Sequence, residues 1–173
     1  MKKTTVVCLL AMSTSSVFAD ESTAEFLSGD GTKLFLAYGT YRSFKSDSNE
    51  GFRCLDTLLS ASLVTEGLKR LTRVERPDHT SNDSFPSGHA TAAFALATFV
   101  SENHPREAPY WYLGAALISK SRLDLGRHRE SDLIAGAAVG YFIAKAEMRS
   151  KKGFFIQGIP GQGPVALGFS ARF

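Results

Sequence analysis

A series of apolar segments with α-helical spacing constrains the fold of this chain more than any other feature of its sequence. In residues 52–71 the leucines recur at intervals that place side chains on one face of a helix. The loop that follows contains Pro77 and Pro86, which do not fit the interior of a helix. We therefore expect an all-α fold, a helical bundle. Its predicted helices cover residues 52–71, 88–100, 110–123 and 131–148, with a shorter helix or two in residues 20–50.

The apolar segments are shorter than a membrane span requires. Residues 133–144 contain no charged side chain, and the uncharged run 90–100 is of similar length. A helix needs about 20 such residues to cross the hydrocarbon layer. The mean hydropathy of the whole chain, −0.08, is also close to zero. These segments therefore predict buried helices of a bundle, while peripheral contact with a membrane stays open.

The first residues have the layout of a secretory signal peptide. Lys2 and Lys3 precede an apolar run. The segment ends with Val17-Phe18-Ala19, which has the small-x-small pattern of a cleavage site, and the acidic residues Asp20 and Glu21 follow it. We expect cleavage after Ala19, so that residues 1–19 are a signal peptide and residues 20–173 form a single domain. The protein would then be exported to the periplasm or the cell envelope. An N-terminal anchor helix, or a first helix of the mature fold, is the alternative.

Charge and cysteine content bear on the partners and cross-links of the chain. It has 20 Lys and Arg against 17 Asp and Glu, and two of the lysines belong to the predicted signal peptide. Because so little net charge is left, nothing in the composition argues for a nucleic-acid partner. Only Cys54 lies outside residues 1–19, so no disulfide within the mature chain is expected. Its helical context favours a place in the core.

Two segments outside the predicted helices have a composition of their own. Residues 45–51 are polar and end in glycine, which predicts an exposed loop. Residues 153–164 are rich in glycine and contain two prolines, as turns do. From 165 to 173 apolar residues alternate with others, a period of two that predicts a short β-hairpin packed on the bundle, or else a loose tail.

Three short stretches hold most of the polar groups that could take part in chemistry: residues 69–77, 84–89 and 121–132. They contain the cations Lys69, Arg76 and Arg122. Cations brought together repel one another unless an anion lies between them. The planar fork of an Arg matches two oxygens of a phosphate, and Lys adds a point charge. We therefore expect these three residues to bind a phosphate group.

The second stretch opens an apolar helix with Pro86-Ser87-Gly88-His89. A helix N-terminus presents free backbone N–H groups and the positive end of the helix dipole, which favour an anion. Ser87 suits the N-cap position and is also a hydroxyl donor. Gly88 has no side chain that would keep an anion away from the backbone. These features favour the same ligand as the cations, a tetrahedral oxyanion.

Two histidines and one aspartate complete the predicted site. His128 and Asp132 lie four positions apart, which would put them on one face at the start of a helix. A carboxylate bonded to one ring nitrogen fixes the tautomer and leaves the other nitrogen free to attack. We therefore expect His128 to be a nucleophile, Asp132 to orient it and His89 to act as general acid. No metal or other cofactor is expected, because the cations stabilise the charge of the transferred group.

Other titratable residues near these stretches receive no firm role. His79 lies in the polar loop and His104 beside a proline, where a surface or capping role is expected. Asp78, Asp83 and Asp124 suit either loop caps or the positioning of a base, and the sequence does not choose between these roles. The spacing of Cys and His that is typical of a metal site is absent.

Together the three stretches resemble the signature of the type 2 phosphatidic acid phosphatase superfamily, which includes lipid phosphatases, bacterial class A acid phosphatases and vanadium-dependent haloperoxidases. Its pattern is K-x6-R-P, then P-S-G-H, then S-R-x5-H-x3-D, and every position is present here. The resemblance implies a helical bundle with the active site at one end. It also implies that Lys69, Arg76, Ser87, Gly88 and Arg122 bind phosphate and that His89, His128 and Asp132 are catalytic.

The resemblance implies a phosphoric monoester hydrolase that works without a metal, through a phosphohistidine, on a phosphorylated small molecule or a lipid (pyro)phosphate. Two other enzyme classes would use the same residues. A phosphoryl or headgroup transferase would pass the group to an alcohol on an envelope lipid, and a vanadate-dependent haloperoxidase would hold vanadate against His128. A lipid-binding or structural protein with an unused site is the non-enzymatic alternative. The lipid phosphatases of the family usually cross the membrane several times, a pattern that the apolar segments of this chain do not fit.

Overall fold

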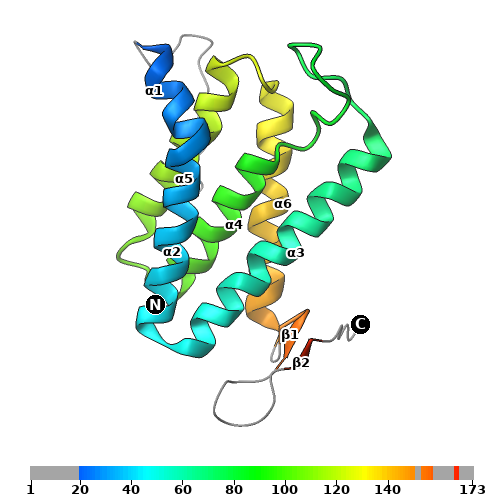
Figure 1. The fold of residues 1–173 in the computed structure, drawn as a ribbon. Helices are drawn as coiled ribbons and strands as arrows, with labels where there is room; N and C mark the ends of the chain where they lie inside the picture. Colours follow the sequence, from blue (N-terminus) through cyan, green and yellow to red (C-terminus); the bar gives the residue numbers. More distant parts are fainter. Residues whose placement is uncertain (1–19, 151–152, 158–165, 168–173) are drawn as a thin grey trace, which may run out of the picture.

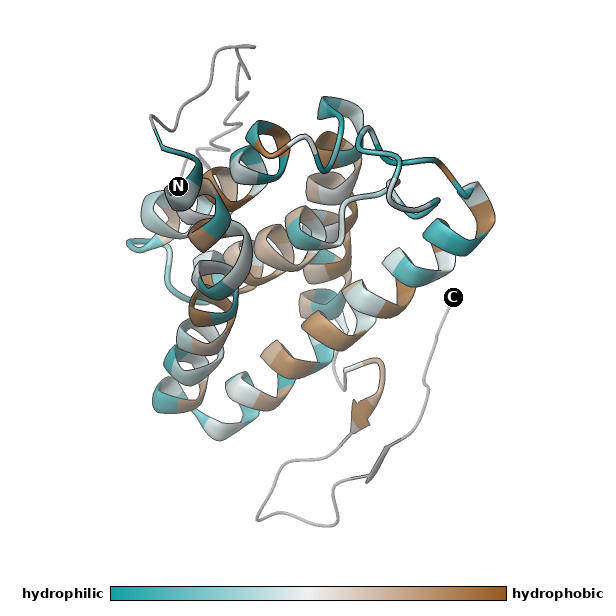
Figure 2. Ribbon diagram, turned by 45° about the horizontal axis from the view of Figure 1, so that its top comes forward, coloured by the Kyte–Doolittle hydropathy of each residue, from teal (hydrophilic) through white to brown (hydrophobic). Residues whose placement is uncertain are grey.

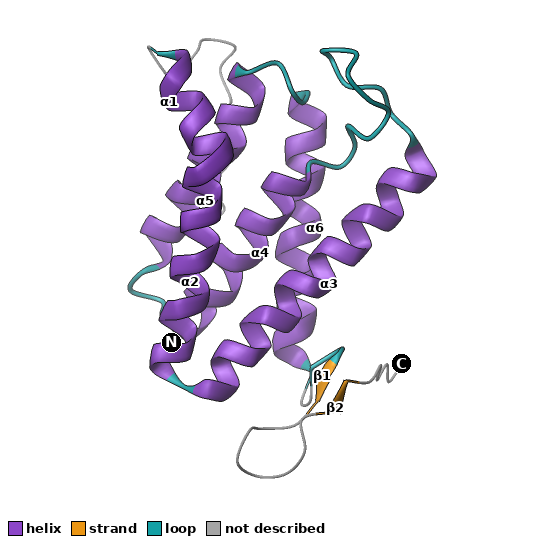
Figure 3. Cartoon of the chain, viewed as in Figure 1, coloured by secondary structure: helices purple, strands orange, loops and turns teal. Residues whose placement is uncertain are grey.

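Helices make up most of what the structure, a computed structural model, describes: residues 20–150, 153–157 and 166–167 (Figure 3). The all-α prediction is confirmed, and the predicted signal peptide, residues 1–19, lies outside the described residues. In chain order the elements are α1 (Glu21–Phe26), the π-helix η1 (Leu27–Gly31), α2 (Thr32–Ser46), α3 (Ser48–Thr72), α4 (Gly88–Asn103), α5 (Ala108–Asp124), α6 (Glu130–Arg149), β1 (Ile156–Gln157) and β2 (Ala166–Leu167).

Helix α4 lies at the centre of the bundle, where it contacts α2, α3, α5 and α6 (Figure 1). Its sequence is rich in alanine, and Ala90, Ala93 and Ala97 are fully buried. Such small side chains let the neighbouring helices approach closely, while Leu96 and Phe99 fill the core between them. The uncharged sequence of α4 therefore marks a core helix, as predicted.

Helix α6 packs directly on the backbone of α4 through two glycines. A methyl group at Gly136 would lie 2.6 Å from the carbonyl oxygen of Ser87, and one at Gly140 would lie 2.7 Å from the backbone nitrogen of Ala95. A side chain at either position would force the two helices apart. The backbone N–H of Ser87 also donates to the carbonyl of Asp132, at 3.0 Å. These contacts hold the first turns of α4 and α6 next to each other.

The antiparallel arrangement of the helices brings four helix ends together at one end of the bundle. There α3 and α5 end, and α4 and α6 begin, at the upper end of the molecule in Figure 1. The loop of residues 73–87, which joins α3 to α4, lies over this end and is largely polar (Figure 2). As a result, the three polar stretches found in the sequence meet at one end of the fold.

The polar segment 45–51 is not an exposed loop, contrary to the prediction. Only Asp47 separates α2 from α3. Its carboxylate accepts hydrogen bonds from the backbone N–H groups of Asn49 and Glu50, at 2.8 and 3.3 Å, and so caps α3. Asp, Ser and Asn are common both in loops and at the N-cap of a helix, so composition alone does not separate the two.

The last residues that the structure describes form a small hairpin at the opposite end of the bundle (Figure 1). Strands β1 and β2 are antiparallel, with Ile156 opposite Leu167. The buried carboxylate of Asp56 on α3 accepts a hydrogen bond from the backbone N–H of Phe154, at 2.6 Å. A short hairpin is thus present and is anchored to the bundle, but its first strand lies in the segment 153–164, for which turns were predicted. Most of the segment 165–173 lies outside the described residues.

The helices differ in how much apolar surface they leave exposed. Helix α4 exposes no large apolar side chain, whereas α3 exposes Leu55, Leu59 and Leu63 along one side. Figure 2 shows such apolar residues at several points along α3. In the part of the chain that the structure describes, none of the helices has both the length and the hydrophobicity that crossing a membrane requires.

Candidate active site

One carboxylate holds two of the three predicted cations. Lys69 lies in the last turn of α3, and Arg76 lies in the loop that follows. Asp83 accepts hydrogen bonds from both, with Arg76 Nε at 2.8 Å and Lys69 Nζ at 3.3 Å from its oxygens. A hydrogen bond from the Ser81 hydroxyl, together with these two cations, holds the pKa of Asp83 well below its usual range. Asp83 therefore fixes Lys69 and Arg76 near each other and balances part of their charge.

Arg122 is the third predicted cation, and it is almost fully buried. It lies in the last turn of α5, is 9% exposed, and donates through a terminal nitrogen to the hydroxyl of Ser28 on η1. Its Nε is buried and has no hydrogen-bond partner among the described residues. Burial and the charges of Arg76 and Arg127 lower the pKa of Arg122 to about 10. A nearby anion would relieve this repulsion and satisfy the unpaired donor.

The start of α4 presents a second unpaired donor. Ser87 occupies the N-cap position as predicted, but its side chain forms no capping hydrogen bond. Its Oγ is buried and has no partner within the described part of the chain. Gly88, the first residue of the helix, lies beside the cations, since a methyl group there would be 3.9 Å from Lys69 Nζ. A hydroxyl, free backbone N–H groups and a Lys therefore converge at this helix end, which suits a tetrahedral anion.

His128 is buried, with 2% of its surface exposed, and one side of its ring faces a carboxylate. Its Nδ1 lies 3.5 Å from Ser84 Oγ and 3.6 Å from Asp132 Oδ2, the latter a close approach rather than a hydrogen bond. The Ser84 hydroxyl donates to Asp132 at 2.5 Å, and the backbone N–H of Arg129 donates to the same oxygen at 3.0 Å. The position of the carboxylate is therefore well determined. Nε2 of His128 has no hydrogen-bond partner among the residues that the structure describes.

His128 and Asp132 do not lie on one face of a helix, although their spacing of four residues predicts that arrangement. Helix α6 begins at Glu130, so His128 lies in the loop before it and Asp132 in its first turn. The Asp132 side chain turns back toward the start of the helix, where it meets the imidazole. Gly126, with a φ of 63°, makes the turn that leads into this loop.

Both histidines of the site bind protons weakly. Burial is the main cause and the charge of Arg122 is the next, so that the pKa values of His128 and His89 are each lowered to about 4. The charge of Asp132 opposes the shift at His128, and a hydrogen bond with the backbone of Ser28 opposes it at His89. An anion at the site would counter the repulsion from the cations, so we expect both pKa values to rise when phosphate binds.

We expect the ligand-free protein to lose stability as the pH falls from 6.5 toward 4, in part because of His128. An unfolded chain takes up a proton on histidine near the reference pKa of about 6.5, whereas folded His128 does so at a pKa of about 4. The contribution of the neutral, buried imidazole is fully present above pH 6.5 and is lost as the pH falls through this window. Its size is on the order of 3 kcal/mol.

Urea unfolding at pH 7 and near pH 4.5 measures this contribution. His128→Gln is expected to lose less stability between the two pH values than the parent protein. His79→Gln, which removes an exposed histidine, is the matched control and should behave as the parent does. An equal loss in all three proteins would show that His128 does not titrate in this way.

Three further residues of the site receive no assignment from the sequence alone. Asp83 suits several roles there, and Ser84 precedes the Pro-Ser-Gly-His motif without any spacing that would single it out. Ser28 contacts Arg122 from a π-helical turn far upstream of the motifs. Single π-helical turns occur often at functional sites, but no residue pattern in the sequence predicts this one.

The two other histidines and Cys54 do not belong to the set of residues that the site brings together. His104 lies at the opposite end of the bundle and bonds Glu50 at 2.9 Å. His79 is exposed and bonds Glu75 at 2.8 Å. Cys54 is fully buried in the core, and burial raises the pKa of its thiol to about 11, which suits a packing role rather than a reactive one.

The structure brings the predicted phosphate-binding and catalytic residues together at one end of the bundle, although their roles stay predictions. Unpaired donors and cations can bind a tetrahedral oxyanion there, and a nitrogen with a free lone pair can attack its central atom. Within the described residues no group of three or more His, Cys, Asp and Glu side chains is placed to hold a metal ion. The fold and the site define a helical-bundle protein in which two histidines and three cations meet at one end of the bundle, a candidate site for an oxyanion.

The chain belongs to the PAP2 superfamily, whose sequence profile matches residues 51–155. The match begins in the first turn of α3, runs through α6 and includes every motif residue of the site. It confirms the resemblance that the three polar stretches carry. No solved structure matches the chain with significance.

Curated relatives share part of their length with this chain. A protein named Lipid A 1-phosphatase from Porphyromonas gingivalis is 35% identical over 95 residues, which is 53% of this chain and 21% of that protein. Proteins of the same name from Rhizobium etli and Rhizobium johnstonii are each 28% identical over 127 residues, which is 64% of this chain and 55% and 52% of those proteins. The chain thus spans between about a fifth and just over half of the length of these relatives.

Proposed function

We propose that the chain is a metal-independent phosphatase that hydrolyses a lipid phosphate or another phosphomonoester in the cell envelope. The observation that supports this most is the environment of His128, a buried imidazole whose Nδ1 faces Asp132 and whose Nε2 has no hydrogen-bond partner among the described residues. The charges of Arg122, Arg76 and Lys69 all act on this ring. Membership of the PAP2 superfamily and relatives named Lipid A 1-phosphatase add support from outside the site.

In the first step of the proposed reaction, Nε2 of His128 attacks the phosphorus atom, and the bond between phosphorus and the oxygen of the leaving alcohol breaks. His89 gives its proton to that oxygen, so the alcohol leaves neutral. Asp132 stabilises the proton that stays on Nδ1 of His128, which becomes positively charged as the N–P bond forms. The products of this step are the alcohol and a phosphohistidine.

In the second step, water attacks the phosphohistidine and the N–P bond breaks. His89, now neutral, takes a proton from the attacking water, and inorganic phosphate leaves. His128 is thereby regenerated as a neutral imidazole. Throughout both steps Lys69, Arg76 and Arg122 stabilise the charge on the equatorial oxygens, a task that needs no metal ion.

The low pKa of His89 in the ligand-free site fits this scheme only if substrate binding changes it. Burial and the charge of Arg122 lower that pKa to about 4, so His89 is neutral at pH 7 before the substrate arrives. A phosphate group between the cations and His89 reverses the sign of the nearest charge. The substrate itself would therefore promote the protonation that His89 needs as general acid.

Phosphate release by the purified chain, measured with a chelator present, tests the proposed function. The substrates are p-nitrophenyl phosphate, phosphatidic acid, an isoprenyl pyrophosphate and a lipid A 1-phosphate. We expect release from at least one of them and no effect of the chelator. Loss of release in chelator that an added metal restores would contradict the metal-free scheme, and no release from any of the four would contradict the function.

We also propose that the protein works against the surface of an envelope membrane, with one side of α3 facing the lipid. Leu55, Leu59 and Leu63 are 37%, 41% and 51% exposed and recur every four residues, which places them on neighbouring turns of one side. Arg70 and Arg73 are exposed at the end of the same helix, next to the site. Apolar side chains with basic residues beside them fit a surface of anionic lipids. The predicted signal peptide supports export to this location.

Cosedimentation with vesicles of phosphatidylglycerol and phosphatidylcholine tests this contact. The double variant Leu59→Glu, Leu63→Glu is expected to bind the vesicles less than the parent, since each new charge would enter the lipid boundary. Leu113→Glu is the control, because Leu113 is an exposed leucine on α5 rather than α3. Hydrolysis of p-nitrophenyl phosphate should be unchanged in both. Equal binding of all three proteins would exclude α3 as the contact.

A further inference from the structure

Of the site residues named above, Ser28 lies farthest along the chain from the motifs. It belongs to the π-helix η1, whereas the family profile matches residues 51–155. Ser28 is only 6% exposed, although serine is mostly found at the surface. Helix η1 packs against α5, the helix that carries Arg122. A buried polar residue therefore reaches the site from a segment that the family match does not include.

The hydroxyl of Ser28 holds a cation without neutralising it. It accepts a hydrogen bond from Nη1 of Arg122, which is 9% exposed and forms no ion pair with a carboxylate among the described residues. The two other predicted cations both pair with Asp83. A carboxylate fixes a guanidinium and cancels its charge, whereas a hydroxyl only fixes it. The contact with Ser28 therefore leaves the charge of Arg122 available for an anion.

The backbone of Ser28 contacts a second functional group, the ring of His89. Their hydrogen bond favours the protonated ring, and so raises the pKa of His89 against the larger lowering that burial causes. A bond of this sign has a ring nitrogen as donor and the backbone carbonyl oxygen as acceptor. A nitrogen that donates to a carbonyl keeps its proton, which fixes the tautomer of the neutral ring and leaves the other nitrogen for a substrate.

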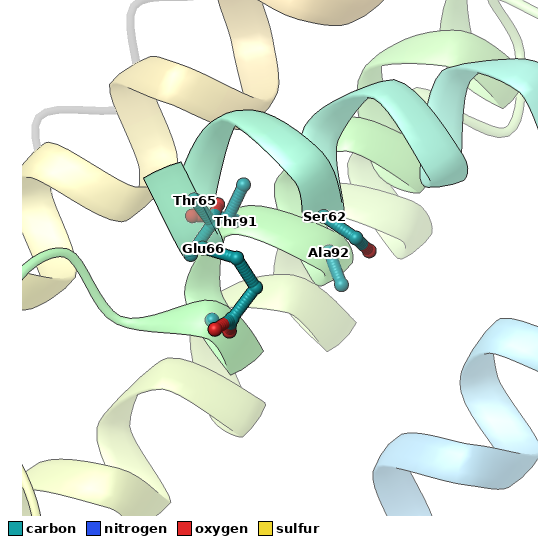
Figure 4. A pocket seen from close by; sticks show the side chains of 6 residues that line it. Ser62, Thr65, Glu66, Thr91 and Ala92 are labelled. Carbon is teal, nitrogen blue, oxygen red and sulfur yellow. The ribbon is translucent and has the colours of Figure 1, made fainter. Parts of the chain in front are cut away.

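The pocket beside the start of α4 does not supply these contacts. Figure 4 shows it between α3 and α4, with side chains from both helices around it. Its lining residues are Ser62, Thr65, Glu66, Gly88, Thr91 and Ala92. None of them hydrogen-bonds Arg122 or His89. Within the part of the chain that the structure describes, the hydrogen bonds of these two side chains come from η1 instead.

We propose that Ser28 is a positioning residue of the active site, whose hydroxyl holds the guanidinium of Arg122 and whose carbonyl holds the ring of His89. A phosphate-binding cation and the general acid then share one anchor. The residue at position 28 has to be neutral, because a carboxylate there would occupy Arg122 before a phosphate arrives. The inference rests on the proposed function for the roles of Arg122 and His89. It goes further in naming the residue that orients both of them and the reason why that residue carries no charge.

Replacing Ser28 with alanine removes the hydroxyl and keeps the carbonyl. For whichever of the four esters the parent hydrolyses fastest, Ser28→Ala is expected to lower kcat/KM about tenfold, the effect of one lost hydrogen bond to a charged group. Ser101→Ala is the matched control, since Ser101 is 7% exposed and lies in the last turn of α4, away from the site. It should change kcat/KM by less than about twofold. Equal losses in the two variants, or no loss in Ser28→Ala, would overturn the proposal.

A double-mutant cycle shows whether Ser28 acts through Arg122. If it does, Ser28→Ala should lower kcat/KM by less than about twofold when Arg122 is already alanine, because the interaction has already been removed. A residue that only stabilises the fold would cause the same loss in both backgrounds. A further loss of about tenfold in the double variant would therefore overturn a positioning role.

Ser28→Asp and Ser28→Asn test the need for a neutral residue with two side chains of nearly equal size. In the Asp variant the new carboxylate should offset the charge of Arg122, which lowers the pKa of His89. Nuclear magnetic resonance titration should then give a pKa for His89 at least about one pH unit higher than in the Asn variant. Inorganic phosphate should bind the Asp variant at least about tenfold more weakly, by calorimetric titration. Equal pKa values and equal affinities in the two variants would overturn the proposal.

The carbonyl contact is tested by the nitrogen-15 chemical shifts of the His89 ring. Above its pKa the ring should be a single tautomer, both in the parent and in Ser28→Ala, which keeps the carbonyl. An even mixture of tautomers in the parent would overturn this part of the proposal. These titrations need no turnover. If the parent releases phosphate from none of the esters, the proposed function fails, while the resonance and phosphate-binding measurements still decide whether Ser28 orients the two side chains.

Discussion

Replacing His128 with alanine is expected to lower phosphate release by at least about 1,000-fold, because the proposed reaction has no other nucleophile. The fold should survive the change. Asp132 keeps the hydrogen bonds from the Ser84 hydroxyl and from the backbone N–H of Arg129, so no buried carboxylate is left unpaired. Phosphate release at saturating substrate and the far-ultraviolet circular dichroism spectrum are the two measurements.

His79→Ala is the control for this substitution, since it removes a histidine that is exposed and outside the site. We expect that variant to retain the activity of the parent. The phosphohistidine scheme would be wrong if His128→Ala retained substantial turnover. A loss of activity together with a loss of the helical spectrum would instead mean that the imidazole is needed for folding, and His128→Gln would then repeat the test with a larger polar side chain.

Replacing Arg122 with alanine is expected to lower kcat/KM by about 100-fold or more, the effect of losing charge-assisted hydrogen bonds to a phosphate in a buried site. Arg122→Lys should recover part of this loss, because Lys restores the charge but not the planar fork of donors. Arg127→Ala, which removes a more exposed cation paired with Asp78, should have a much smaller effect.

The Arg122 substitution also has a readout that does not depend on turnover. The charge of Arg122 is the largest cause after burial of the low pKa of both His89 and His128. Both pKa values should therefore rise in Arg122→Ala, and nuclear magnetic resonance titration of the two rings would follow this. Unchanged pKa values would mean that Arg122 does not lie close enough to the two rings to act on a phosphate between them.

The helices and the residues of the three motifs were predictable from the sequence because each depends on local pattern. The spacing of apolar residues predicts α3 to α6. The motif residues lie at or next to the ends of these helices, and the N-terminus of a helix favours an anion. The prediction of a loop for residues 45–51 was wrong because Asp47 caps a helix, and the residue types that cap helices are also common in loops. A single capping contact decides between the two structures, and it cannot be inferred from composition.

The contacts that complete the site depend on tertiary structure, which the sequence pattern does not contain. Ser28 reaches Arg122 from η1, and only the packing of η1 against α5 brings them together. Ser84 bridges His128 and Asp132 because the loop of residues 73–87 folds over the start of α6. The meeting of His128 and Asp132 was predicted correctly for a reason that proved wrong, since the histidine lies before the helix rather than on it.

The steric course of phosphoryl transfer at phosphorus tests the central claim most directly. The measurement uses a substrate whose phosphorus is made chiral with oxygen isotopes, and an alcohol that accepts the phosphoryl group in place of water. Each in-line displacement inverts the configuration, so attack by His128 followed by attack by the acceptor predicts overall retention. Overall inversion would mean that the acceptor attacks the substrate in a single step, and it would contradict a phosphohistidine at His128.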